Sequence, residues 1–273
     1  MENPFKSPKT VQGAASDDVA AAESLPNWLQ SNRWLIYLLP FMFYSLVQTL
    51  EPTRGDDGTE FGRFVLGIKY EHYPLVYSAK IALTVAAMLL VLRGYRTHPF
   101  RISLWAPAVG VVGVVAWIGL CHLKLEPKIL APLGLDGFLP GGERPGYNPF
   151  DPENLADQPA WAWTFLAIRF FGLAVVVAVI EEFFLRGFVL RFVVAQNWWK
   201  VPFGTVTPLV VVLGTAIPMA MHPGELLASL VWFSMITWLM VRTRNIWDCV
   251  VAHGVTNLLL GIYVVVYDQW QLM

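Results

Sequence analysis

The chain has 273 residues and a net charge of −1; 56% of its residues are hydrophobic and only 14% are charged. Because soluble domains carry about 25% charged residues, this composition excludes an ordinary soluble domain, and the near-neutral charge argues against a nucleic-acid partner. Cys121 and Cys249 are too few for a disulfide framework and lack metal-ligand spacing. The apolar residues gather in blocks of about 20, the length that crosses a bilayer, so we expect an all-α polytopic membrane helical bundle of about seven to eight transmembrane helices.

In chain order, we expect residues 1–32 to form a polar, disordered tail without the apolar core of a signal peptide. Residues 33–273 then form the integral membrane domain. The apolar blocks predict seven spans, at about residues 34–50, 75–92, 102–120, 161–195, 205–221, 225–241 and 246–266. A re-entrant piece within residues 51–73 would raise this number by one.

Basic residues set the predicted orientation, because cytoplasmic loops are enriched in Lys and Arg. With seven spans, the N-terminus is cytoplasmic and the acidic loops 51–73 and 121–160 face outward. Loop 121–160 is rich in Pro and Gly near residues 141–150, so we expect it to lack regular structure and to be either a cap over a site or a linker. The basic residues that fall on one side are Arg33, Arg93, Arg96, Arg101, Arg191, Lys200, Arg242 and Arg244.

Two adjacent acids, Glu181 and Glu182, and Arg186 lie inside the long apolar block that begins at Trp161. Ionised groups in hydrocarbon cost several kcal/mol, so an intramembrane acid pair indicates a functional site. On a helix, Glu182 and Arg186 are four residues apart and share a face, whereas Glu181 lies about 100° away. We therefore expect Glu182 to be tied to Arg186 and Glu181 to be available for chemistry.

Three more polar residues lie at membrane depth. His222 ends the fifth span, and His253 and Asn257 lie four apart on one face of the seventh. If the chain turns near Val201, residue counting places Glu181 and His222 at about the same height. The same counting places His253 less well, unless a helix tilts or breaks near His222.

Other charged residues in the spans have simpler explanations. Lys80 is expected to extend its ammonium to the membrane interface. Arg169 is expected to do the same, with recognition of a substrate carboxylate as the alternative. Asp248 lies near the start of its helix, where an acid suits the helix dipole.

These motifs resemble a known family. Glu181-Glu182-x-x-x-Arg186 resembles the first motif of the CAAX-protease and bacteriocin-processing (CPBP, Rce1-like) intramembrane proteases, the type II CAAX endopeptidases. His222 matches their second motif and His253-x-x-x-Asn257 their third, and the protease-like core covers residues 161–270. The turn at 241–247 is similar to the one that usually precedes the third motif. One departure is Pro218, where the second motif usually has Phe, which puts the placement of His222 in question.

The resemblance implies hydrolysis of a peptide bond within the membrane. Glu181 with His222 is expected to activate a water molecule, and His253 with Asn257 to donate hydrogen bonds to the developing oxyanion. Glu182 and Arg186 are expected to support this geometry. No cofactor is expected. The alternative is a zinc ion bound by Glu181, His222 and His253, although the chain has no His-Glu-x-x-His motif.

The resemblance also bears on partners and location. Residues 181–191 and 253–263 look closest to a bacterial branch related to CAAX prenyl proteases and associated with exosortase sorting systems. It implies the bacterial inner membrane, a membrane protein or peptide substrate, the lipid bilayer, and association with an exosortase-like sorting system. The competing hypotheses are a non-proteolytic scaffold or immunity protein on the same fold, and a proton-coupled transporter, for which the sequence shows no internal repeat.

Overall fold

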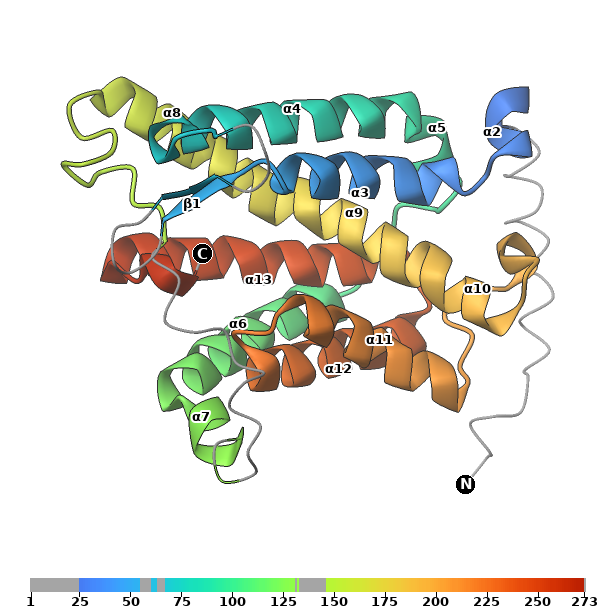
Figure 1. Cartoon of the computed structure of the whole chain (residues 1–273). Coiled ribbons are helices and arrows are strands. Elements are labelled where there is room, and N and C mark those ends of the chain that lie inside the picture. Colours follow the sequence, from blue (N-terminus) through green and yellow to red (C-terminus); the bar gives the residue numbers. More distant parts are fainter. Residues whose placement is uncertain (1–24, 55–59, 63–66, 131, 133–145, 273) are drawn as a thin grey trace.

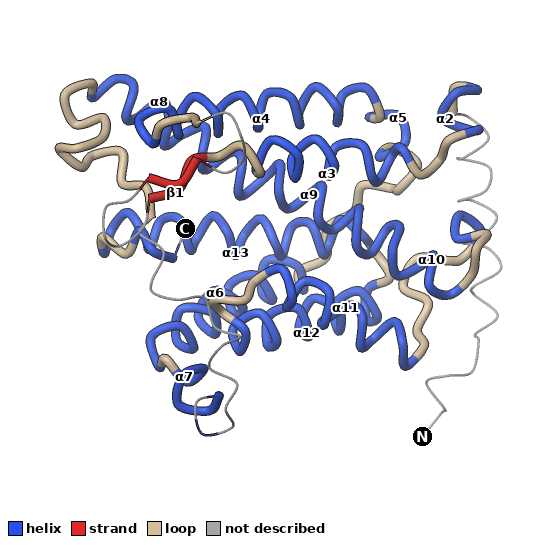
Figure 2. The backbone as a smooth tube through the Cα atoms, viewed as in Figure 1, coloured by secondary structure: helices blue, strands red, loops and turns tan. Residues whose placement is uncertain are grey.

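The computed structural model describes residues 25–54, 60–62, 67–130, 132 and 146–272. Within this part the chain is a bundle of helices with one short antiparallel hairpin, β1 (Pro52–Arg54) paired with β2 (Glu60–Gly62) (Figures 1 and 2). The predicted all-α membrane bundle is thus confirmed.

Each predicted span forms a helix or a helical stretch. Five stretches are long and apolar enough to cross a membrane, whereas α3 and α11, with 14 residues each, are shorter than the usual span. The helices are α2 (Asn27–Ser31), α3 (Leu35–Gln48), α4 (Tyr73–Leu90), α5 (Leu92–Tyr95), α6 (Trp105–Leu123), α7 (Leu125–Leu130), α8 (Pro159–Phe171), α9 (Ala178–Glu182), α10 (Leu190–Val194), α11 (Pro208–Met221), α12 (Leu226–Thr243) and α13 (Ile246–Tyr267).

The stretch from α8 to α10 is one continuous helix of 36 residues, Pro159–Val194. Two π-helical segments interrupt it, η4 (Gly172–Val177) and η5 (Phe183–Val189). They lie on either side of α9, which carries the acid pair. The acid pair therefore lies on a short α-helical segment between two widened helical turns.

The α8–α10 helix crosses the molecule diagonally, with α3 and α4 on one side and α6, α11 and α12 on the other (Figure 1). Helix α13 packs along α9 and η4, and also against α6. This packing is close: a Cβ atom on Gly254 would lie 2.5 Å from the Ala174 carbonyl oxygen. Because Gly254 lies between His253 and Asn257 in sequence, the contact places both residues against the acid-bearing helix.

Two differences from the sequence predictions concern the loop 121–160 and the N-terminal tail. Residues 121–130 were expected to be irregular, but α6 continues to Leu123 and α7 follows after Lys124, which adopts a left-handed conformation with φ 45°. The Pro- and Gly-rich part lies mostly further on, and residues 131 and 133–145 lie outside the described residues. Residues 1–24 of the predicted tail also lie outside the described residues. The end of that tail differs from the prediction, because it contains helix α2 and Leu29 is buried in the core.

Candidate active site

The predicted site residues meet at one cavity. Glu181 on α9, His222 at the C-terminal end of α11, and His253 and Asn257 on α13 all line a cavity of about 590 Å³. They come from three separate parts of the chain, and aromatic side chains such as Trp117, Trp232 and Phe233 line the cavity with them. The sequence thus identified residues that the fold brings together, including His253, whose height the residue counting had not explained. The chain does break after α11, where His222–Glu225 forms a turn closed by a hydrogen bond of 3.2 Å.

Glu181 and Glu182 have opposite environments. Glu181 is partly exposed at the cavity and has no hydrogen bond or ion pair within the described part of the chain. Glu182 is fully buried, at 0% exposure. Adjacent positions on a helix point about 100° apart, so one side chain faces the cavity and the other faces the packed core.

The Glu182 carboxylate holds two partners. Its Oε2 atom lies 2.8 Å from Nη1 of Arg186, and its Oε1 accepts a hydrogen bond of 2.9 Å from Nδ1 of His253. The predicted pair with Arg186 is confirmed, but the contact with His253 was not foreseen. Nothing local in the sequence encodes it, because it depends on how α13 packs against α9.

Arg186 depends on this one carboxylate. Its side chain is 1% exposed, and its Nε and Nη2 atoms have no hydrogen-bond partner among the described residues. The guanidinium lies 5.9 Å from the centre of the Phe233 ring, a cation–π contact. A buried guanidinium with so few other contacts makes Glu182 its main source of charge compensation.

His222 is fixed by a backbone acceptor. Its Nδ1 atom lies 2.8 Å from the carbonyl oxygen of Pro218. The rings of Trp117 and Phe233 pack beside the imidazole, with centroids 5.8 and 5.4 Å away. The departure from the family pattern at Pro218 therefore does not remove His222 from the cavity; Pro218 supplies its hydrogen-bond acceptor.

Both imidazoles are held in the same way. A carbonyl and a paired carboxylate only accept hydrogen bonds, so the Nδ1 atoms of His222 and His253 must carry the protons. Each histidine then has Nε2 as the nitrogen left for the cavity. Phe233, which the sequence analysis did not single out, contacts both imidazole rings.

Part of the Asn257 amide is used in a hydrogen bond to the protein backbone. Its Nδ2 atom donates a hydrogen bond of 2.9 Å to the carbonyl oxygen of Leu173, in the π-helical segment η4. The second N–H of the amide and its oxygen remain for the cavity, which Asn257 lines.

The same residues do not fit a zinc site. Within the part of the chain that the structure describes, no three His, Cys, Asp or Glu side chains are grouped closely enough to hold a metal ion. Glu181, His222 and His253 line the same cavity but do not form such a group. A tetrahedral site needs three protein ligands about 2 Å from the metal, which this arrangement does not supply.

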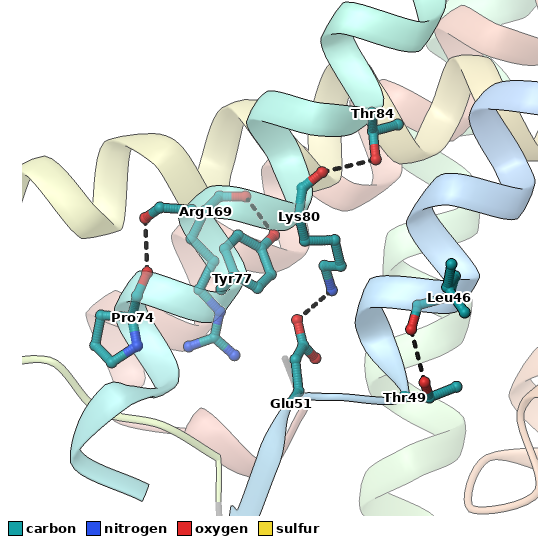
Figure 3. Close-up of polar contacts among 9 residues, drawn as sticks. Leu46, Thr49, Glu51, Pro74, Tyr77, Lys80, Thr84 and Arg169 are labelled. Atoms are coloured by element: carbon teal, nitrogen blue, oxygen red, sulfur yellow. Dashed lines mark hydrogen bonds and ion pairs between the residues drawn. The ribbon is translucent and has the colours of Figure 1, made fainter. Parts of the chain in front are cut away.

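The charged residues that were expected at the membrane interface lie in or beside the cavity, which is lined by Arg169 and by Glu51, the partner of Lys80. Lys80 is 1% exposed and its Nζ lies 2.5 Å from Oε1 of Glu51, which follows α3 (Figure 3). Arg169 is 3% exposed, lines the cavity, and donates a hydrogen bond of 2.7 Å to the Tyr147 carbonyl. The expectation that Lys80 and Arg169 extend to the interface is therefore wrong, because neighbouring chain segments cover both.

Aromatic rings lie beside these charged groups. The Lys80 ammonium lies 4.3 and 4.5 Å from the ring centres of Tyr44 and Tyr77. Burial raises the pKa of Tyr147, and the neighbouring hydroxyl of Tyr70 adds to the effect, so the Tyr147 phenol stays protonated at neutral pH.

Comparison with known families agrees with these motifs. Residues 161–259 match the family model described as type II CAAX prenyl endopeptidase Rce1-like. The match spans all the motif residues from Glu181 to Asn257 and confirms the predicted resemblance over this part of the chain; the exosortase-associated branch is not shown by it. Comparisons with curated proteins and with solved structures give no match. Together with the five apolar helices, the match supports an integral membrane protein in which residues 161–259 are similar to this endopeptidase family.

Proposed function

We propose that the chain is an intramembrane endopeptidase that hydrolyses a peptide bond of a membrane-associated protein. The observation that supports this most is the shared cavity: an unpartnered carboxylate, two imidazoles and an amide line one space inside a membrane bundle. The family match, which is to a family of CAAX-type endopeptidases, adds to it. Intramembrane ionisable groups are costly, and their convergence on one cavity favours a catalytic role over a packing role.

In this proposal Glu181 is the general base. A water molecule between Glu181 and Nε2 of His222 gives up a proton to the carboxylate while its oxygen bonds to the scissile carbonyl carbon. The carbonyl oxygen becomes an oxyanion in the tetrahedral intermediate. When the C–N bond breaks, the proton held by Glu181 passes to the leaving amine, so the reaction consumes one water and needs no other reactant.

The oxyanion would be stabilised from α13. Asn257 has one amide N–H left for the cavity, and His253 in its protonated form donates Nε2–H. The buried Glu182 carboxylate orients the ring by accepting the hydrogen bond from Nδ1. Glu182 and Arg186 thus act through His253 rather than on the substrate.

The orientation of the chain, its membrane and its substrate are also part of the proposal. Positive-inside counting supports a cytoplasmic N-terminus, and the sequence resemblance favours a bacterial inner membrane and a substrate from an exosortase-like sorting system. The substrate would enter the cavity from the bilayer or from the membrane surface.

The test is cleavage of tagged co-resident membrane proteins in reconstituted membranes, comparing wild type with Glu181→Gln. We expect Glu181→Gln to lower the rate by at least about 10²-fold, since general acid–base groups contribute 10²–10⁴-fold. The matched control is Glu71→Gln, because the Glu71 side chain is 64% exposed and lies outside the cavity. A metal chelator should change nothing.

Two outcomes would contradict parts of the proposal. Chelator-sensitive cleavage would overturn the metal-free mechanism and make His222 and His253 metal ligands. If wild type and Glu181→Gln behaved alike and the cellular phenotype persisted in both, the chain would be a non-proteolytic scaffold on the same fold.

A further inference from the structure

The imidazole of His222 is fixed by an acceptor that an uninterrupted helix would not leave free. In an α-helix, the N–H of residue 222 would bond to the carbonyl of residue 218. Here the His222 N–H instead bonds to the Met219 carbonyl, at 3.1 Å. The Pro218 carbonyl, left over at the helix end, accepts the hydrogen bond from the imidazole Nδ1.

The cause lies in the next residue of the sequence, Pro223. A residue that precedes proline is disfavoured in the α-helical conformation because the proline ring clashes with its backbone. His222 accordingly has φ −122° and ψ 62°, and α11 ends at Met221. Proline therefore ends the helix at the residue that carries the imidazole, and the last-turn carbonyls lose their helical donors.

We propose that Pro223 is a positioning residue for the reaction: by ending α11 at Met221 it leaves the Pro218 carbonyl to the imidazole of His222 and holds that ring with Nδ1 protonated and Nε2 available to the cavity. The role of Nε2 beside the water rests on the proposed function. The hydrogen-bonded tautomer itself does not, and it can be measured without any substrate.

No other group described around the His222 imidazole accounts for its tautomer. The rings of Trp117 and Phe233 pack against the imidazole but offer no hydrogen-bond acceptor, so they limit its movement without selecting a tautomer. Glu225, the nearest acid in sequence, lines the same cavity, and its backbone N–H bonds to the His222 carbonyl. Selection of the tautomer then comes from the Pro218 carbonyl.

The substitution Pro223→Ala tests this. Alanine allows residue 222 to become helical, so that its backbone N–H competes with the imidazole for the Pro218 carbonyl. The matched control is Pro208→Ala, at the opposite end of the same helix. Proline at a first helical position lacks an N–H that would be unpaired there anyway, so this control should leave His222 unchanged.

The first readout is nitrogen NMR of the protein labelled with ¹⁵N-histidine, in mildly alkaline buffer where free imidazole is neutral. The chain has five histidines, and loss of one signal set in His222→Gln assigns His222. Wild type should show a protonated Nδ1 and an unprotonated Nε2, and Pro223→Ala a mixture of both tautomers. A wild-type His222 with its proton on Nε2 would overturn the inference, even if Pro223→Ala did not fold.

The second readout is cleavage. Pro223→Ala should lower kcat about tenfold and leave KM within about twofold, a part of the 10²–10⁴-fold that acid–base groups supply. The pH profile should change with kcat, which a loss of folded protein would not cause. A Pro223→Ala protein with the wild-type tautomer and full kcat would refute the inference. If Glu181→Gln cleaved like wild type, the proposed function would fail while the NMR result stood.

Discussion

The adjacent acids Glu181 and Glu182 should separate activity from stability when each is changed to Gln. Glu182→Gln keeps the size of the side chain but removes the charge that faces Arg186, whose side chain is 1% exposed. Breaking a buried ion pair by removing one partner costs about 3–5 kcal/mol, because the other charge stays buried and uncompensated. Glu181→Gln removes no contact within the described part of the chain and should change stability by less than about 0.5 kcal/mol.

The assay is SDS titration of the detergent-solubilised protein, followed by fluorescence of its 12 tryptophans and paired with the cleavage measurement. Glu181→Gln should unfold like wild type and be inactive. Glu182→Gln should unfold at much lower SDS and lose activity, because the uncompensated charge of Arg186 disturbs the packing around the site. Equal and small losses of stability in the two variants would refute the structural assignment of Glu182.

A double-mutant cycle measures the pair directly. Arg186→Met alone should also destabilise strongly, whereas Glu182→Gln with Arg186→Met should cost much less than the sum of the two, because no buried charge remains. The amide oxygen of the new Gln can still accept from Nδ1 of His253. Additive losses would show that Glu182 and Arg186 do not interact in the folded protein.

Three further changes test other contacts. Gly254→Ala should destabilise by about 1–3 kcal/mol and lower cleavage, because its Cβ would lie 2.5 Å from the Ala174 carbonyl oxygen; SDS titration and kcat check both effects. Lys80→Met should destabilise by leaving the largely covered Glu51 without its partner, and Lys80→Met with Glu51→Gln should recover most of that loss in the same titration. Burial lowers the pKa of His98 to about 3, so folding favours its neutral form, and stability present above about pH 6.5 should be lost as pH falls toward 3. The loss from this group is about 2 kcal/mol at pH 5, and His98→Gln should reduce the pH dependence of unfolding.

Local rules predicted much of the bundle and part of the site. The apolar blocks predicted the helices, because each block must satisfy its own backbone hydrogen bonds in the membrane. Helical spacing alone predicted that Glu182 pairs with Arg186 and that Glu181 stays outside this pair. Helical spacing does not predict contacts between different elements, such as Glu182 with His253 and Lys80 with Glu51.

Lys80 shows why such contacts escape sequence reasoning. Its distance from the end of its own span suggested that the ammonium could reach water. The hairpin of α3 and α4 instead places Glu51, just after α3, beside the inner turns of α4 (Figure 3). Whether a charge is buried with a partner or extended to the interface is thus decided by the neighbouring helix, which hydropathy along one segment does not describe.

The positions of Glu181, His222 and His253 are connected by one physical requirement. A base and two imidazoles in a membrane must each keep a reactive atom at the cavity while their other polar atoms are satisfied. The structure meets this for the imidazoles by giving each Nδ1 an acceptor, the Pro218 carbonyl for His222 and the Glu182 carboxylate for His253. The two acceptors come from different places: the Pro218 carbonyl belongs to the helix that ends beside His222, and the Glu182 carboxylate belongs to a helix packed against α13. Both rings therefore present Nε2 to the cavity, although one is held by its own helix and the other by a neighbouring helix.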